Sequence, residues 1–223
     1  KELDQDGIKF ISVLKKEKEN SKEFNQDLKI TLNIPDKIDQ NSELNNDDGY
    51  ITFKSSLQNI AKYNFSKIKN YNLFEPNLTF DNQNIIFFDN KGTILKFDDK
   101  SKLIWKTNIY SKDEKRSGPL PTMIKKNDQL IIADNLANLY SINIENGNEI
   151  WKTKNQNPFN SQIKIYKDKF FVVDSNNNLN CFSTINGNLI WSYKTEKSFI
   201  NSFKKLSILI KDNIIVFNNS IGD

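Results

Sequence analysis

The chain has 223 residues, of which 37% are hydrophobic and 12% aromatic, and a formal net charge of +4. This length and apolar content are enough for one sizeable packed domain or two small ones. Lysine and acidic residues are interspersed, and no run of five or six like charges forms a basic arm. The composition therefore predicts a globular protein without a nucleic-acid partner.

Catalytic and metal-binding side chains are scarce. The chain has no histidine, which removes the most common general base and metal ligand. Its single cysteine, Cys181, excludes an internal disulfide and, without histidine, an ordinary structural zinc site. Cys181 is expected in the core, with a reactive thiol as the alternative. The acidic pairs Asp47-Asp48 and Asp98-Asp99 are interpreted as solvated turn residues rather than a catalytic pair, because adjacent strand residues point to opposite faces.

The apolar runs, such as residues 85–88, are short, whereas a membrane-spanning helix needs about 20 apolar residues. The sequence therefore predicts no membrane span. The chain begins at Lys1 rather than at methionine, so we expect a processed or trimmed N-terminus, and a signal peptide or lipid anchor would lie upstream.

The N-terminal part differs in composition from the rest. Residues 1–48 are expected to form a polar, extended or mobile lead-in, with one apolar patch at residues 28–32 that could pair as a strand. Residues 49–69 look like a strand or two. The second predicted domain spans residues 49–223.

An internal repeat fills most of this second domain. Similar segments begin at residues 84, 129 and 169, and a fourth begins at residue 213. Their tryptophans, Trp105, Trp151 and Trp191, are spaced by 46 and then 40 residues. Each complete unit contains short β-rich runs separated by turns. This period and pattern favour an all-β fold, a propeller of four-stranded blades. The units are expected at about residues 75–110, 118–155, 160–196 and 200–223, which gives three blades and the start of a fourth.

Two Asn-Gly pairs mark hairpin turns within the repeats. Asn146-Gly147 and Asn186-Gly187 predict type I′ turns, because both central residues of that turn need positive φ. The first unit has Asp99-Lys100-Ser101 at this place and is one residue shorter. The repeated tryptophans are interpreted as packing residues between blades, with ligand stacking as the alternative.

The repeats resemble the PQQ-like β-propeller family, whose signature is Ala-x-Asp-x-x-Thr-Gly-x-x-x-Trp. The pairs Gly147/Trp151 and Gly187/Trp191 keep the signature's glycine-to-tryptophan spacing. The resemblance implies a blade-docking role for these four residues and for Trp105. Other signature positions differ: Ser141 and Cys181 replace alanine, Asn143 and Ser183 replace aspartate, and Asn146 and Asn186 replace threonine.

Within that family the chain is most similar to the outer-membrane assembly lipoproteins of the BamB type found in alphaproteobacteria. Residues 6–14 resemble the short Gly-x-Arg-x-x-Val-Leu stretch before the propeller, with Lys9 in place of arginine. Residues 116–122, Arg-Ser-Gly-Pro-Leu-Pro-Thr, resemble the loop that opens a blade. The repeat match covers about residues 75–223, and the ring of this family usually has eight blades. We therefore expect a fragment that exposes one unpaired blade face and is marginally stable or self-associating.

Arg116 is the only arginine in the chain. The resemblance implies that it contacts the central protein of the barrel-assembly machinery, and the alternatives are that it caps its loop through backbone carbonyls or that its occurrence here is accidental. The resemblance also implies a non-enzymatic periplasmic scaffold beside the outer membrane, without a cofactor, that assists β-barrel assembly and could bind unfolded outer-membrane proteins. A quinoprotein-like dehydrogenase and a sensor or carbohydrate-binding propeller are the alternative functions.

Overall fold

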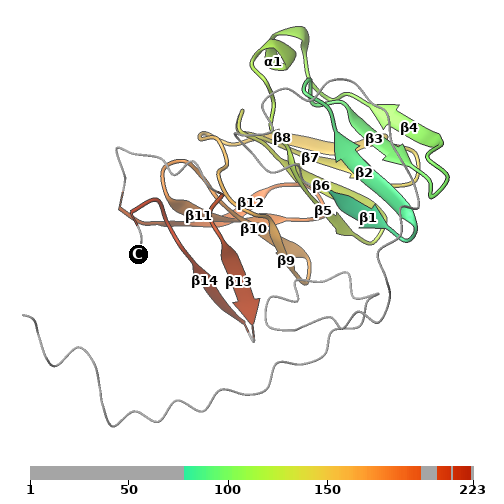
Figure 1. Ribbon diagram of the computed structural model, residues 1–223. Helices are drawn as coiled ribbons and strands as arrows, with labels where there is room; N and C mark the ends of the chain where they lie inside the picture. The colour runs from blue at the N-terminus through green and yellow to red at the C-terminus, as the bar shows by residue number, and fades with distance from the viewer. Residues whose placement is uncertain (1–77, 197–204, 212, 222–223) are drawn as a thin grey trace, which may run out of the picture. The chain divides into compact units, whose positions relative to one another are not determined.

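The computed structural model describes residues 78–196, 205–211 and 213–221, all of which belong to one compact unit (Figure 1). The lead-in at 1–48, the expected strands at 49–69 and the Gly-x-Lys segment at 6–14 lie outside the described residues. These expectations therefore stay predictions.

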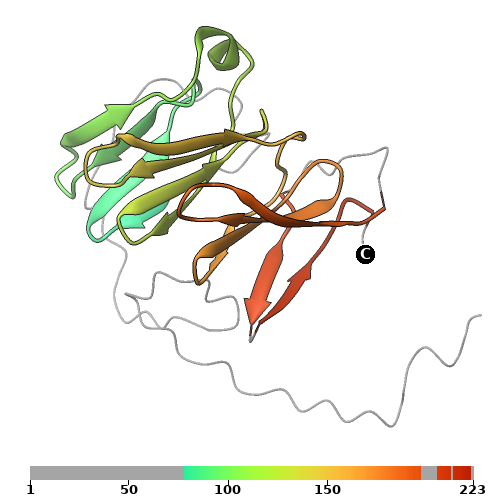
Figure 2. The same cartoon turned by 180° about the vertical axis from the view of Figure 1, so that it is seen from behind.

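The described chain is nearly all β and forms successive antiparallel sheets in chain order (Figures 1 and 2). Blade 1 contains β1 (Thr79–Asp81), β2 (Asn84–Phe88), β3 (Ile94–Phe97) and β4 (Leu103–Thr107). Blade 2 contains β5 (Thr122–Lys126), β6 (Gln129–Ala133), β7 (Asn138–Asn143) and β8 (Glu149–Lys154). Blade 3 contains β9 (Lys164–Tyr166), β10 (Lys169–Val173), β11 (Asn178–Ser183) and β12 (Leu189–Lys194). Blade 4 is described as the pair β13 (Ile208–Lys211) and β14 (Ile214–Phe217). The predicted fold class is confirmed.

The hydrophobic core consists of three layers, each between two consecutive sheets. Side chains of a strand alternate between the two faces of its sheet. In β6, Leu130 and Ile132 therefore join the layer shared with blade 1, whereas Ile131 and Ala133 join the layer shared with blade 3. The third layer joins blade 3 to β13 and β14. Burial of both sheet faces explains why these strands are continuous apolar runs rather than alternating ones.

An aspartate directly follows the second strand of each complete blade. The Oδ1 atom of Asp134 accepts hydrogen bonds from the backbone N–H groups of Leu136 and Asn138, both at 2.8 Å. Asp89 and Asp174 make the same pair of bonds two and four residues downstream. A short side-chain acceptor replaces the missing backbone partners of the tight turn. The repeated aspartate is therefore a turn residue.

The type I′ prediction for the outer turns is wrong. Gly147 and Gly187 have φ of 74° and 70°, but Asn146 and Asn186 are not among the residues with positive φ. The turn is longer than two residues, because the N–H of Gly147 donates to the carbonyl of Asn143 at 2.8 Å. The Asn143 side chain also accepts from the N–H groups of residues 145 and 146. Because the Asn143 side chain stabilises this longer turn, only one of its residues, Gly147, needs a positive φ.

One helix occurs in the described residues, α1 (Lys112–Arg116), which joins blade 1 to blade 2. With five residues, it is far below the length that could cross a bilayer, and no other helix is present in the part of the chain described here.

Candidate functional site

The connection between blades 1 and 2 carries Arg116 and is locally well defined. Ser111 is the N-cap of α1, and it forms a capping box with Glu114. The Ser111 N–H donates to Glu114 Oε2 at 2.8 Å, and the Glu114 N–H donates to Ser111 Oγ at 3.3 Å. This Ser-x-x-Glu pattern is readable in the sequence, although the loop was predicted without a helix. Arg116 thus ends a short helix rather than lying in an irregular Gly/Pro loop.

The same glutamate attaches α1 to blade 2. Glu114 Oε1 accepts a hydrogen bond from Asn138 Nδ2 at 3.1 Å, and Asn138 also donates to Asp134. The backbone N–H of Ser111 is the largest influence that lowers the pKa of the Glu114 carboxyl. Glu114 therefore stays charged at neutral pH while it holds the helix to the start of β7.

The segment after α1 is held by a second side chain of blade 2. Asn135 Oδ1 accepts from the Leu120 N–H at 2.7 Å, and its Nδ2 donates to the Gly118 carbonyl at 3.2 Å. Upstream of α1, the buried ring of Tyr110 meets Tyr140 of β7 edge-on, with centroids 5.7 Å apart. Both ends of the Arg116 segment are therefore anchored to blade 2. The sequence reasoning gave no role to the side chains of Glu114, Asn135 and Asn138, because their contacts join separate elements of the chain.

Arg116 itself points into solvent. Its side chain is 82% exposed, and Nη1 lies 3.5 Å from Oδ1 of the equally exposed Asp113. Within the described residues this is the one polar contact of the guanidinium that the structure defines, and it is not a bond to a backbone carbonyl. The C-terminal end of α1 is closed instead by the N–H of Ser117, which donates to the carbonyls of Asp113 and Glu114. The geometry of the described residues therefore gives no support to the loop-capping alternative, because the exposed guanidinium pairs with Asp113 rather than with a backbone carbonyl.

Between consecutive blades, a tryptophan of one outer strand meets the outer turn of the next blade. Trp105 Nε1 donates to the Ile144 carbonyl at 3.0 Å, and Trp151 Nε1 donates to the Thr184 carbonyl at 3.0 Å. A Cβ added to Gly147 would lie 2.8 Å from the Trp105 ring, and one added to Gly187 would lie 2.6 Å from the Trp151 ring. No side chain larger than glycine fits there without displacing the indole. We propose that these contacts hold the blades together.

In the described residues, no outer turn with a glycine lies against the third tryptophan, Trp191. Trp191 is 39% exposed, whereas Trp105 is 9% exposed. In the described part of the chain, the Trp191 ring lies near the Phe171 ring, with centroids 5.8 Å apart, and no indole N–H bond of the kind made by the other two is present. The spacing in the sequence predicted the same environment for all three tryptophans.

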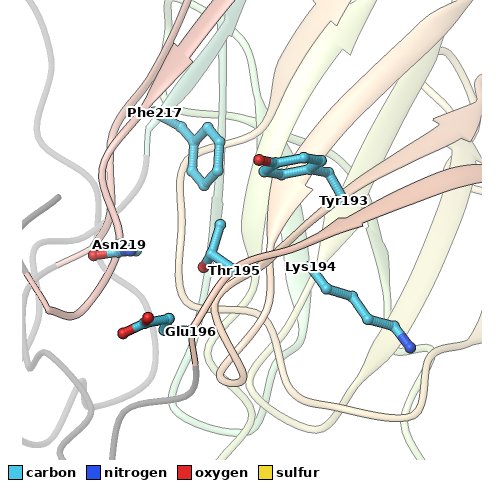
Figure 3. A pocket seen from close by; sticks show the side chains of 6 residues that line it. All are labelled: Tyr193, Lys194, Thr195, Glu196, Phe217 and Asn219. Atoms are coloured by element: carbon cyan, nitrogen blue, oxygen red, sulfur yellow. The ribbon is translucent and has the colours of Figure 1, made fainter.

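The C-terminal end of β12 and the end of β14 line an open hollow of about 560 Å³. Figure 3 shows the Tyr193 ring pointing toward Phe217, with Thr195 between the two strands and Lys194 pointing away. Glu196 and Asn219 complete the lining. The hollow is therefore apolar at one end and polar at the other.

A buried ionic cluster lies between blades 1 and 2. Asp81 of β1 binds Lys96 Nζ at 2.6 Å and Lys125 Nζ at 2.9 Å. Lys96 is 2% exposed, and its ammonium also donates to the Ile144 carbonyl at 3.0 Å. Burial alone would raise the pKa of the Asp81 carboxyl, but hydrogen bonds and charges from both lysines outweigh burial and lower it. The sequence reasoning missed this cluster because its members come from three different strands.

The described residues contain no cluster of three or more acidic, cysteine or histidine side chains that could hold a metal ion. Cys181 is buried in the third core layer, and burial raises the pKa of its thiol to about 11. The thiol therefore stays protonated at neutral pH.

Solved structures share this fold at low sequence identity. The computationally designed Ika4 protein matches with a TM-score of 0.58 and 13% identity, over 75% of this chain and 96% of Ika4. The designed Ika8 protein matches with a TM-score of 0.53 and 15% identity, over 65% of this chain and 42% of Ika8. BamB from Moraxella catarrhalis matches with a TM-score of 0.53 and 13% identity, over 64% of this chain and 42% of that protein.

At these identities the likeness shows the fold alone. The matched part of this chain spans less than half the length of Ika8 and of the Moraxella protein. None of the curated proteins matches the chain.

The family comparison is more specific, because it extends over more than half of the chain. The PQQ_2 family, described as outer membrane protein assembly factor BamB, matches residues 90–223. The matched range holds β3 to β14, α1 and all three tryptophans. The chain therefore belongs to the family of the outer membrane protein assembly factor BamB.

Proposed function

We propose that this protein is a non-enzymatic scaffold of the periplasm that assists the assembly and insertion of outer-membrane β-barrel proteins. The observation that carries this proposal is the family match over residues 90–223, which covers the repeats from β3 onward together with the Arg116 segment. The BamB-like fold of the described blades is consistent with it. The proposed partner is the central protein of the barrel-assembly machinery, and unfolded outer-membrane proteins are a second class of partner.

Arg116 is the residue that we propose contacts this partner. Its guanidinium is exposed at the end of a helix whose start is held by the Ser111–Glu114 capping box. The ion pair with Asp113 is long and solvent-exposed, and such pairs contribute little, about 0–1 kcal/mol. A partner carboxylate can therefore replace Asp113 at small cost.

The identity of this residue matters as well as its charge. Guanidinium is planar and donates through a fork that matches a carboxylate in two parallel hydrogen bonds. It also loses its hydration more easily than an ammonium group does. An arginine on a pre-ordered segment is thus suited to an interface where the surrounding lysines are not.

The test is a pull-down from outer-membrane extract, with the retained proteins identified by mass spectrometry. We compare the parent with Arg116→Glu, Arg116→Lys and Lys112→Glu. Lys112 lies on the same helix and is also exposed, so its variant reverses a charge without touching the guanidinium. We expect retention of the barrel-assembly protein to fall at least about tenfold for Arg116→Glu and less for Lys112→Glu. Equal retention by all four proteins would contradict the role of Arg116.

The same preparation separates the scaffold from the alternative functions. Reduction of a dye that requires added quinone cofactor and calcium would favour a quinoprotein dehydrogenase. Specific retention of a glycan instead of a barrel protein would favour a carbohydrate-binding propeller. Cell fractionation that places the protein away from the outer membrane would contradict the proposed location.

A further inference from the structure

The outer turns of blades 2 and 3 contain the two Asn-Gly pairs of the chain, Asn146-Gly147 and Asn186-Gly187. An asparagine before a glycine is prone to deamidation, because glycine has no Cβ to hinder attack of its backbone nitrogen on the asparagine side chain. Both pairs continue with a further asparagine, so the reacting sequence is Asn-Gly-Asn in each turn. A difference in reactivity between the two folded turns therefore has to come from the hydrogen bonds around them.

Both turns are closed by the same backbone hydrogen bonds. The glycine N–H of the blade 2 turn donates to the Asn143 carbonyl at 2.8 Å, and that of the blade 3 turn donates to the Ser183 carbonyl at 2.9 Å. The side-chain oxygens of Asn146 and Asn186 each accept from the N–H two residues downstream, at 2.9 Å and 3.1 Å. The attacking nitrogen and the side-chain amide are thus both engaged while the turn is closed. Deamidation proceeds from a locally opened turn, and its rate depends on the free energy of opening.

The two turns are also tied to the preceding blade by equal numbers of bonds. The Ile144 carbonyl accepts from the indole N–H of that blade and from Lys96, both at 3.0 Å. Thr184 accepts the corresponding indole N–H at its carbonyl, at 3.0 Å, and Lys126 at its hydroxyl, at 2.8 Å. The N–H groups of Ile144 and Thr184 each donate to a backbone carbonyl of their own blade. These anchors therefore do not distinguish the two turns.

The side chain that begins each turn does distinguish them. Asn143 Oδ1 accepts from two backbone N–H groups, that of the residue two positions on at 2.9 Å and that of Asn146 at 3.1 Å. Ser183 has the same place in blade 3, and its Oγ accepts only from the Ile185 N–H, at 3.2 Å. For the N–H of Asn186, the described structure defines no acceptor. Opening of the blade 3 turn therefore breaks one hydrogen bond fewer.

We propose that Asn186 is a site of spontaneous deamidation in the folded protein, and that Asn143 protects Asn146 from the same reaction. The backbone nitrogen of Gly187 loses its proton to hydroxide and forms a bond to Cγ of Asn186. The bond from Cγ to Nδ2 breaks, and the side-chain nitrogen takes up a proton from water and leaves as ammonia. Water then opens the cyclic imide at either carbonyl and leaves aspartate or isoaspartate. This inference does not depend on the proposed scaffold function.

The product forms at the contact between blades 2 and 3. Gly187 lies against the Trp151 ring, which a Cβ on this glycine would approach to 2.6 Å. Isoaspartate adds a methylene group to the main chain directly before this glycine. The modification thus changes the backbone at a place where the structure leaves little room.

The test follows both pairs in one sample of the full chain, kept folded in mildly alkaline buffer. Trypsin cleaves after lysine and arginine, so the two pairs lie in separate peptides, 127–152 and 170–194. Mass spectrometry of successive digests measures the fraction of each peptide in which the amide has become a carboxyl, and labelling with an isoaspartyl methyltransferase identifies isoaspartate. Ser183→Asn gives blade 3 the side chain that stabilises the turn of blade 2. Asn143→Ser is the reciprocal change.

In the folded parent, Asn186 should deamidate at least about threefold faster than Asn146, because one hydrogen bond shifts the opening equilibrium by about that factor or more. Ser183→Asn should slow the reaction at Asn186, and Asn143→Ser should speed the reaction at Asn146. The second variant keeps the test valid if the first does not fold. In a denaturant that unfolds the parent, the two rates should become nearly equal, because the reacting sequences are the same.

Equal rates at the two pairs in the folded parent would overturn the proposal. So would a difference in rate that persists in denaturant, because it would then come from the sequence and not from the turn. A ratio that both variants leave unchanged would contradict the role of Asn143. The absence of any reaction at Asn186 in the folded chain, over a time in which the denatured chain reacts, would also overturn the proposal.

Discussion

The junction between blades 1 and 2 and the outer face of blade 3 contain the same tryptophan in the same register, yet one indole is 9% exposed and the other 39%. The covered ring has a glycine turn and a backbone carbonyl from the following blade. At Trp191 the following blade is described only as β13 and β14. The comparison teaches that the role of each tryptophan depends on the neighbouring blade and not on its own strand.

The largest expected difference between the two regions is the loss of unfolding free energy when each tryptophan is replaced by alanine. Trp105→Ala is expected to lower the free energy of unfolding by about 3–5 kcal/mol, because it empties a buried site and removes one of the two hydrogen bonds to the Ile144 carbonyl. Trp191→Ala should cost no more than about 1 kcal/mol, since its ring is already partly hydrated. Chemical denaturation of both variants measures the difference. Equal losses would mean that Trp191 is covered in solution.

The ionic cluster at the covered junction can be tested with Asp81→Asn. The variant keeps the shape of the side chain but leaves Lys96 buried beside a neutral amide, and breaking a buried pair costs about 3–5 kcal/mol. Because the lysines lower the pKa of Asp81, its contribution is present above the unfolded-state pKa of about 4 and is lost as the pH falls through the lower folded-state pKa.

Melting temperatures of the parent should therefore decline as the pH falls below about 4, and this component should be missing in Asp81→Asn. Lys102→Ala, an exposed lysine of blade 1, serves as the control and should retain the decline. If the melting temperature of Asp81→Asn falls with pH as that of the parent does, Asp81 is not the group that causes the decline.

A smaller effect is expected at the glycine turns. Gly187→Ala adds a Cβ that would lie 2.6 Å from the Trp151 ring, and overpacking of this kind costs about 1–3 kcal/mol beyond the strain of a positive φ. Gly118→Ala is the matched control: its φ is 70°, but nothing lies within 4 Å of the added Cβ. The free energy of unfolding of Gly118→Ala should fall only by the strain of an alanine with positive φ, about 1 kcal/mol. Thermal melts that give the same loss for both would show that the Trp151 contact adds nothing.

The smallest expected effect is a gain of stability. Ala137 has φ of 67° and occupies the turn position held by Gly92 in blade 1 and Asn177 in blade 3. Ala137→Gly removes the strain of a left-handed alanine and should raise the free energy of unfolding by about 0.5–1 kcal/mol. Because this turn lies away from the tryptophan contacts, the gain should be the same in the parent and in Trp191→Ala. A gain in only one of them would mean that the blades do not unfold as one unit.

Much of the fold could be read from the repeats. The apolar runs, the turns between them and the tryptophan spacing predicted four-stranded blades, because strand alternation and turn geometry depend on neighbouring residues. The resemblance of residues 116–122 also drew attention to the segment that carries Arg116. The type I′ turns were predicted wrongly, because the Asn143 side chain holds a longer turn in which one residue is left-handed.

The sequence by itself therefore determined the strands, their order and the repeat, since each of these rests on local conformational preference. Only the tertiary structure decided that Lys96 and Lys125 share Asp81, that the carbonyls of Ile144 and Thr184 receive the indoles, and that Arg116 is presented on an anchored helix. Asp81 and Lys125 are 44 positions apart in the sequence, and the stacking of one sheet on the next brings such residues together. Trp191 carries the same local sequence signal as its two counterparts, and its different state depends on what packs against blade 3.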